Sequence, residues 1–287
     1  MSIISFENVH YTYPGDDMES LCGIDLAIEK GLSHIALTDH DTVDGVRRAM
    51  DYAADKDITV IPGIELSSEY NGRDIHIVGL NIDIENEEFK EYLKDFVNDR
   101  EKRNEKMCKL LTDAGLNLTY EELKSEFPDS VITRAHFARL MLKKGYTQSL
   151  KEAFDRYIGD TCPYFVPRNK ISASMAVDLI KKAKGIPVLA HPMLYHMSMA
   201  RINDLVDELK GYGLMAIEAI YTTNTNSDER DIRVLAARKG LEISGGSDFH
   251  GKAKPKTELG TGYGSLFVPE SVWFDLKNRW EKEYSLK

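Results

Sequence analysis

The sequence has few cysteines, and the three it has, Cys22, Cys108 and Cys162, lie far apart. An odd number of cysteines without a C-x-x-C pair argues against a disulfide framework and against a zinc knuckle. No apolar run approaches the length of about 18 residues that a membrane-spanning helix needs. The N-terminal segment MSIISFENVHYTYPGDD also lacks the order of a secretory signal. We therefore expect a protein of the reducing cytoplasm with no membrane partner.

Basic residues are also in short supply. The 287-residue chain has 37 Lys and Arg against 47 Asp and Glu, which gives a formal charge of −10 at pH 7. Stable binding to duplex nucleic acid relies on Lys and Arg that neutralise phosphates, so this balance argues against it. A small phosphorylated substrate held by a few local cations remains compatible with the charge. No pattern indicates an oligomeric state.

Proline and glycine are scarce too, with 9 and 20 residues, while 42% of the chain is hydrophobic. This composition is typical of globular proteins. In the first and last thirds, short β-branched runs alternate with helical patterns, which predicts an α/β fold with a mostly parallel sheet that curves or closes into a barrel. The predicted strands are Ile3–Phe6, His34–Thr38, Ile58–Pro62, Asp74–Leu80, Ile186–Ala190, Met215–Ile220 and Leu241–Ser244. The predicted helices between them are Leu21–Lys30, Thr42–Lys56, Ser172–Lys184 and Arg201–Gly211, the last two ending at a glycine suited to a C-cap.

The middle of the chain has a different pattern. Residues 85–167 show helical periodicity without a convincing strand. We therefore predict two parts: an α/β domain made of residues 1–84 and 168–287, and an inserted α-helical subdomain made of residues 85–167.

Histidine and carboxylate side chains stand at or just after several predicted strands: Asp39, His40, Asp41, Glu65, His76, His191, Asp248 and His250. In α/β barrels the carboxyl ends of the strands converge on one rim, so residues far apart in sequence share one pocket. Imidazole and carboxylate ligands suit Mn, Fe or Zn in a hydrolytic centre. Glu65 follows an apolar strand, where a carboxylate without a partner would be costly to bury. We expect Asp39 or Asp41 to orient the His40 ring.

Five ordered segments carry a resemblance to a known family. They are TDHDT (38–42), PGIE (62–65), the strand residue His76, AHP (190–192) and GSDFHG (246–251). In this order they resemble the PHP phosphoesterases, the polymerase and histidinol phosphatase domain proteins, and within them the branch that hydrolyses small nucleotide phosphates and carries an inserted lid. The resemblance implies a distorted seven-stranded (β/α) barrel with an inserted α-helical subdomain.

The same resemblance implies a trinuclear metal centre with two to three divalent cations, for which Mn is favoured and Fe or Zn are alternatives. Glu65 would bridge two of the metals. The implied ligands are Asn8, His10, Asp16, His40, Glu65, His76, His191, Asp248 and His250. Of these, the residues implied to be catalytic are Glu65, His191, Asp248 and His250.

The N-terminal motif departs from the family pattern. The family has H-x-H followed by a short turn, whereas Asn8 here stands where the first histidine is expected, and Asp16 lies in a Pro-Gly-Asp turn. An Asn side chain can coordinate a metal through its carbonyl oxygen but carries no basic nitrogen. A non-catalytic binding module therefore stays open as an alternative.

The helical insertion offers two candidate substrate-binding residues, Arg134 and His136. Arg134 would bind a phosphate through two parallel hydrogen bonds, and His136 would donate to a leaving oxygen. In the alternative interpretation, Arg134 pairs with a surface acid and His136 packs.

The predicted function is hydrolysis of phosphate esters by metal-activated water. By resemblance, the substrates are small nucleotides with 5' or 3',5' phosphates, or short 5'-phosphorylated oligonucleotides. The alternatives are a phosphoribosyl cyclic phosphodiesterase and a histidinol-phosphate-type phosphatase, which would use the same metals with another pocket.

The metal content of the purified protein tests the predicted centre. Mass spectrometry of protein purified without chelator should find about two to three divalent cations per chain. An Asn8→His variant is the comparison. One cation or none in the unaltered chain, rising in the variant, would mean that Asn8 weakens the centre and would favour the binding module.

Overall fold

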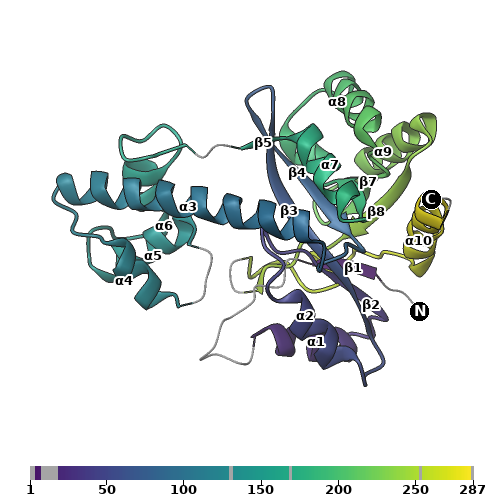
Figure 1. Ribbon diagram of the computed structural model, residues 1–287, viewed down its shortest axis with the longest axis horizontal. Coiled ribbons are helices and arrows are strands. Elements are labelled where there is room, and N and C mark those ends of the chain that lie inside the picture. Colours follow the sequence, from purple (N-terminus) through teal and green to yellow (C-terminus); the bar gives the residue numbers. More distant parts are fainter. Residues whose placement is uncertain (1–3, 8–18, 129–131, 168–169, 252–253, 286–287) are drawn as a thin grey trace. The chain divides into compact units, whose positions relative to one another are not determined.

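The computed structural model describes residues 4–7, 19–128, 132–167, 170–251 and 254–285 (Figure 1). Contacts within the chain divide them into two units. The first contains residues 4–7, 19–91, 170–251 and 254–285, and the second contains residues 92–128 and 132–167. The predicted insertion, 85–167, begins slightly earlier than the second unit, whose first residue, Tyr92, lies inside a long helix.

The first unit is built on a curled sheet. Seven strands follow one another in the order β1-β2-β3-β4-β6-β7-β8, and the short β5 pairs with β3. β1 also lies against β8, so the path curves back toward its start. The bounds are β1 (Ile4–Glu7), β2 (His34–Leu37), β3 (Thr59–Tyr70), β4 (Arg73–Leu80), β5 (Ile171–Ser172), β6 (Ile186–Leu189), β7 (Ala216–Tyr221) and β8 (Glu242–Gly246). The predicted α/β class and all seven predicted strands are confirmed.

One strand of this sheet runs against the rest. β1–β2, β2–β3, β6–β7 and β7–β8 are parallel, whereas β4 is antiparallel to both β3 and β6. Asn71 and Gly72 connect β3 to β4 with φ angles of 49° and 76°. An Asn-Gly pair favours a two-residue hairpin because both positions need positive φ. β3 therefore extends to Tyr70 instead of ending at Pro62 as predicted.

Apolar side chains of this sheet pack against the last helix, α10 (Glu270–Ser285). β6 is buried along its whole length, as expected of a strand covered on both faces. Each such side chain contributes roughly 1.5–3 kcal/mol when fully buried. The cluster includes Ala36, Ile61, Leu80, Ile186, Val188, Ile220, Trp273 and Leu276.

The other helices of the first unit are α1 (Glu19–Glu29), α2 (Val46–Ala53), α7 (Ala173–Lys182), η2 (Pro192–Tyr195), α8 (Met199–Tyr212) and α9 (Asn226–Lys239). Side-chain oxygens of Ser172, Ser198 and Thr225 accept backbone N–H groups at the starts of α7, α8 and α9. The glycine that ends α8 is Gly213, with φ 106°, two positions beyond the predicted Gly211.

The second unit is helical, with no strand among its described residues. It contains most of α3 (Glu87–Asp113), followed by α4 (Tyr120–Glu126), α5 (Arg134–Lys143), α6 (Leu150–Ala153) and the π-helical turn η1 (Phe154–Ile158). It has its own apolar core, which includes Met107, Leu111, Leu118, Leu123, Phe137, Met141 and Ala153.

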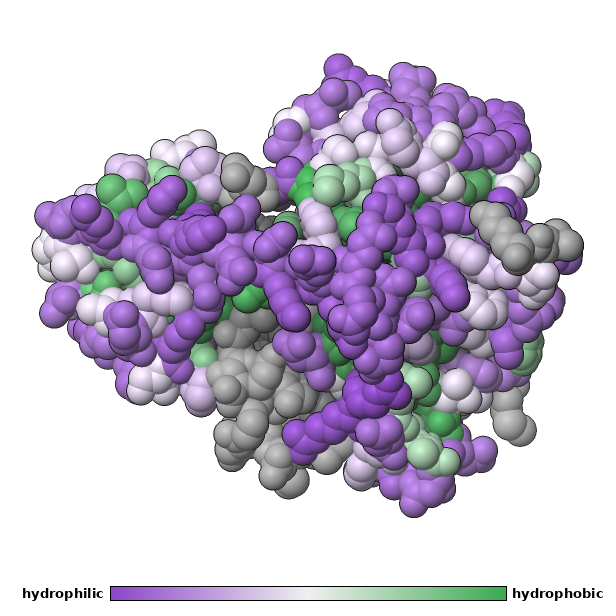
Figure 2. Space-filling view, in the orientation of Figure 1, coloured by the Kyte–Doolittle hydropathy of each residue, from purple (hydrophilic) through white to green (hydrophobic). Residues whose placement is uncertain are grey.

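Hydrophilic side chains cover most of the face shown in Figure 2. Among the described residues, no helix combines the length and the hydropathy needed to cross a membrane.

The segments of β2, β3 and β4 approach one another closely around Gly63, so a larger residue there should change the stability of the fold. A Cβ atom at Gly63 would lie 2.7 Å from Thr38 Cγ2 and 2.9 Å from the Gly79 carbonyl oxygen, so Gly63→Ala should lower the free energy of unfolding by about 1–3 kcal/mol. Gly211→Ala is the control, because its Cβ meets nothing within 4 Å inside α8. That change should raise stability by about 0.5–1 kcal/mol. Urea unfolding of both variants decides, and equal effects would contradict the steric argument.

Candidate metal centre

The pairing of β2 with β3 continues beyond the end of β2. The Asp41 N–H donates to the Glu65 carbonyl oxygen at 3.0 Å, and the Glu65 N–H donates to the Asp39 carbonyl oxygen at 3.1 Å. His40 lies between these two hydrogen bonds and forms a β-bridge with Glu65. The main chain therefore fixes His40 beside Glu65 at the carboxyl end of β2.

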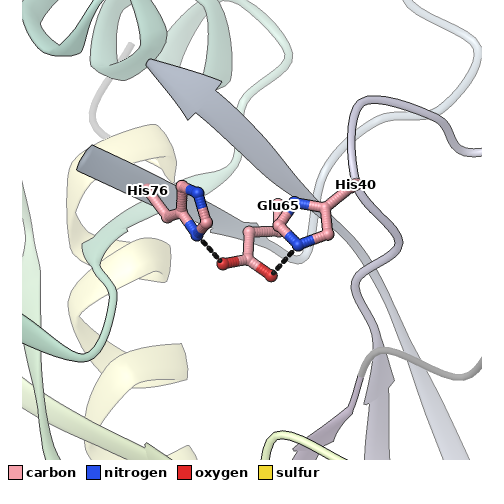
Figure 3. Close-up of side chains that lie close together, drawn as sticks. All are labelled: His40, Glu65 and His76. Atoms are coloured by element: carbon pink, nitrogen blue, oxygen red, sulfur yellow. Dashed lines mark ion pairs between the residues drawn. The ribbon is translucent and has the colours of Figure 1, made fainter. Parts of the chain in front are cut away.

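Glu65 is the centre of the site, with only 3% of its surface exposed. Its Oε1 atom lies 2.7 Å from His76 Nδ1 and 3.0 Å from His191 Nε2, and its Oε2 atom lies 3.5 Å from His40 Nε2. In Figure 3, His40 and His76 reach the carboxylate from two sides. Three imidazoles from three different parts of the chain thus surround one buried carboxylate.

The imidazole rings also contact one another. Ring centroids are 4.9 Å apart for His40 and His76, 5.1 Å for His76 and His191, and 6.3 Å for His40 and His250. His250 follows β8, and its Nδ1 atom lies 2.9 Å from the main-chain oxygen of Asp248. The structure therefore brings six of the predicted ligands into one region of the first unit, whereas Asn8, His10 and Asp16 lie outside the described residues.

Electrostatics give Glu65 and His40 the protonation states of metal ligands, whereas at His76 the attraction of Glu65 outweighs the effect of burial and raises the pKa. Burial alone would raise the pKa of Glu65, but His40, His76 and a hydrogen bond from His191 hold it well below its usual value. Burial lowers the pKa of His40 to about 4, although the charge of Glu65 acts to raise it. Near neutral pH, Glu65 is ionised and His40 is neutral, and these are the forms that bind cations.

The donor set fits a divalent metal. One ligand atom each from His40, Glu65 and His76 lie within 4.8 Å of one another. His40 Nδ1 and His191 Nδ1 are buried without a hydrogen-bond partner in the described chain, so no contact there fixes which ring nitrogen carries the proton. With a cation in place of the Glu65 contact, each ring can carry its proton on Nδ1 and present a lone pair through Nε2. Imidazole and carboxylate donors suit Mn, Fe or Zn.

His191 occupies an unusual backbone conformation, with φ 25°. Its N–H donates to Glu218 Oε2 at 2.7 Å, and the Tyr195 hydroxyl donates to the Ala190 carbonyl oxygen at 2.5 Å. The His76 N–H donates to the same tyrosine oxygen at 3.1 Å. Backbone strain of this kind persists only where the surroundings hold it, and these hydrogen bonds do so.

Asp41 has a different partner from the one we expected. Its carboxylate accepts hydrogen bonds from Ser67 N at 2.8 Å and Ser67 Oγ at 3.0 Å, while His40 Nδ1 has no hydrogen-bond partner among the described residues. Asp41 thus stabilises the position of β3 next to Glu65. The expectation that Asp39 or Asp41 accepts a hydrogen bond from the free nitrogen of His40 is wrong.

Asp248 lies after β8 with φ 55°. Its Oδ2 atom accepts a hydrogen bond from the Tyr221 hydroxyl at 2.7 Å and forms an ion pair with Lys254 Nζ at 2.5 Å. Tyr221 is the last residue of β7 and is buried. Two donors therefore converge on a single oxygen of this predicted ligand.

Sequence reasoning missed Glu218, Tyr221, Tyr195 and Lys254. Only Glu218 gave a local signal, because a glutamate inside the otherwise apolar strand AIEAIY needs a polar partner when the strand is buried. The other three act through contacts between residues distant in sequence, which leave no local pattern.

The two predicted substrate-binding residues lie in the second unit. Arg134 Nη1 donates to Asp160 Oδ1 at 2.5 Å, and the guanidinium lies over the Phe165 ring at 4.9 Å. His136 Nδ1 accepts the Thr133 N–H at 2.9 Å and closes the capping box at the start of α5. These contacts match the alternative in which Arg134 pairs with an acid and His136 packs. The substrate-binding roles stay predictions.

Comparisons with known proteins find similar sequences and structures. The family model described as PHP domain matches residues 16–166. A 5'-3' exoribonuclease of Haemophilus influenzae is 33% identical over 78% of this chain and 81% of its own length. A 3',5'-nucleoside bisphosphate phosphatase of Chromobacterium violaceum is 30% identical over 89% of this chain and 90% of its own.

Among solved structures, an amidohydrolase from Chromobacterium violaceum, with bound sulfate and no metal, superposes with a TM-score of 0.79. It is 28% identical, and the match covers 96% of both chains. The curled seven-stranded sheet is therefore an arrangement that this solved structure shares over nearly its whole length.

Glu218 supports a prediction about pH. Burial raises its pKa from the usual 4.5 to about 8, although His191 pulls it down. The folded chain therefore binds more protons than the unfolded chain between these values. The Glu218 contribution to the free energy of unfolding of the metal-free protein should therefore fall as pH rises from about 4.5 to about 8, by up to ~1.4 kcal/mol per pH unit.

Glu218→Gln should remove this contribution, because an amide oxygen still accepts the His191 N–H but does not titrate. Urea unfolding of chelator-treated protein at several pH values measures the difference in slope. The exposed Glu69→Gln serves as the control. Parallel curves for wild type and Glu218→Gln would contradict the assigned pKa.

Proposed function

The chain belongs to the PHP domain family, and from this membership we propose that it is a metal-dependent phosphoesterase. Its substrates are small nucleotides with 5' or 3',5' phosphates, or short 5'-phosphorylated oligonucleotides. The observation that carries the proposal is the buried, ionised Glu65 carboxylate with three imidazoles around it.

Six described residues would hold the metals: His40, Glu65, His76, His191, Asp248 and His250. We propose Asn8, His10 and Asp16 as further ligands, and a complement of two to three cations, with Mn favoured over Fe or Zn. Bound divalent cations supply a water of lowered pKa as nucleophile and neutralise phosphoryl oxygens.

The protein's own residues prepare the site for this chemistry. Glu65 is ionised and His40 neutral near pH 7, so neither must lose a proton before a cation binds. Glu218 holds the main chain of His191, and Tyr221 holds one oxygen of Asp248. These contacts fix the ligand atoms in advance, which limits the reorganisation needed on binding.

The names of the relatives support a nucleotide substrate. One is a 5'-3' exoribonuclease and another a 3',5'-nucleoside bisphosphate phosphatase, and the related solved structure holds sulfate, an anion shaped like phosphate. The formal charge of −10 favours a small substrate over duplex nucleic acid. Cys108 and Cys162 are free thiols, which supports a cytoplasmic location.

We further propose that residues 85–167 form the inserted helical subdomain and that Arg134 and His136 bind substrate. Arg134 is paired with Asp160, so binding a phosphate there requires exchange of one anion for another. The exchange favours a doubly charged phosphate over a singly charged carboxylate.

Phosphate release from a substrate panel tests the proposal. Protein loaded with Mn should release phosphate from a nucleoside 3',5'-bisphosphate or shorten a 5'-phosphorylated oligonucleotide. Activity solely on histidinol phosphate, or solely on a cyclic phosphoribose diester, would overturn the nucleotide assignment. No release from any member of the panel at saturating Mn would favour a binding module.

The same assay tests the ligands. Glu65→Gln and His250→Ala should each lower the rate at least ~100-fold, because each removes a ligand from the centre. Glu69→Gln, an exposed carboxylate on the same strand as Glu65, should leave the rate unchanged. Losses much smaller than this would mean that the metal assignment is wrong.

A further inference from the structure

Among the lysines that the structure describes, Lys254 contacts the proposed centre. Its Nζ atom lies 2.5 Å from Asp248 Oδ2, the oxygen that also accepts the Tyr221 hydroxyl at 2.7 Å. No other Lys or Arg among the described residues pairs with Asp248 or Glu65. The Asp248 side chain is 14% exposed, whereas the Lys254 side chain is 43% exposed and reaches the carboxylate from solvent.

The two donors to this oxygen respond differently to a divalent cation bound beside it. The Tyr221 hydroxyl is neutral and buried at the end of β7, so it can stay on Asp248 beside a divalent cation. The Lys254 ammonium carries a full positive charge, and a divalent cation on the same carboxylate would repel it at close range. Lysine has a flexible four-carbon stem, so its charge can move without rearranging the fold.

We propose that Lys254 neutralises Asp248 only until a divalent cation takes this carboxylate, and that the released ammonium then binds a phosphate group of the substrate. The proposal rests on the phosphoesterase function argued above. Lys254 is then a specificity-determining residue for phosphorylated substrates. Its ammonium pairs either with the Asp248 carboxylate or with a phosphate, but not with both at once.

The proposal demands opposite effects on cation and substrate. In Lys254→Gln, the lysine ammonium no longer competes for Asp248, so Mn should bind more tightly. The same variant lacks the ammonium that binds phosphate, so the KM for substrate should rise. A lysine with a purely structural role would not strengthen one interaction while weakening the other.

Lys256→Gln is a matched control, because Lys256 is an exposed lysine two residues along the same segment. Three measurements are needed on wild type and both variants. Titration calorimetry gives the Mn affinity of chelator-treated protein, a second titration gives the affinity of Mn-loaded protein for inorganic phosphate, and turnover of a nucleoside 3',5'-bisphosphate gives KM and kcat.

Lys254→Gln should lower the Kd for Mn about threefold or more, because a competing charge is gone. It should raise the Kd for phosphate and the KM about tenfold, as expected for the loss of one charge-assisted hydrogen bond, with kcat changed less than about threefold. Lys256→Gln should match wild type in all three measurements.

Two results would overturn the proposal. If Lys254→Gln binds Mn no more tightly than Lys256→Gln does, Lys254 does not compete for Asp248. If Mn binds more tightly but phosphate affinity and KM do not change, Lys254 is a counter-ion only. Absence of turnover in wild type would instead count against the phosphoesterase function, and both titrations would still report on Lys254.

Discussion

A buried, ionised carboxylate is the constraint on which this structure depends. Glu65 is almost wholly removed from water, and an unpaired charge there would be costly. Its neighbours offset the cost, because His40, His76 and His191 all point nitrogen atoms at its two oxygens. The sheet must therefore deliver side chains from three separate segments to one point.

The reversed strand β4 explains how His76 reaches that point. The two-residue Asn-Gly turn sets the register of the hairpin, which places His76 opposite Ser67. Side chains two positions apart on a strand share a face, so Glu65 and Ser67 project to the same side, and His76 is diagonal to Glu65. Asp41 holds Ser67 through two hydrogen bonds and so fixes this face of β3.

The sequence predicted most of the sheet, because buried strands such as β6 are short apolar runs that stand out locally. It predicted the candidate ligands because imidazoles and carboxylates at strand ends are chemically distinctive. The reversal of β4 was missed, although Asn71-Gly72 signals a hairpin. The contacts of Tyr221 and Lys254 with Asp248 could not be predicted, since they join residues that only the folded sheet brings together.

The kind of metal ligand affects how strongly a chain of formal charge −10 can attract a phosphorylated substrate. The negative electrostatic potential of such a chain opposes the approach of a phosphorylated substrate, so the attraction must come from positive charge near the site. Neutral imidazoles bind cations without cancelling their charge, and among the six described candidate ligands only Glu65 and Asp248 are carboxylates. A centre built from these residues keeps net positive charge once loaded with divalent cations. A centre of carboxylates alone would cancel it. In the proposed centre, the histidine-rich ligand set would thus give an acidic protein a local binding site for phosphate.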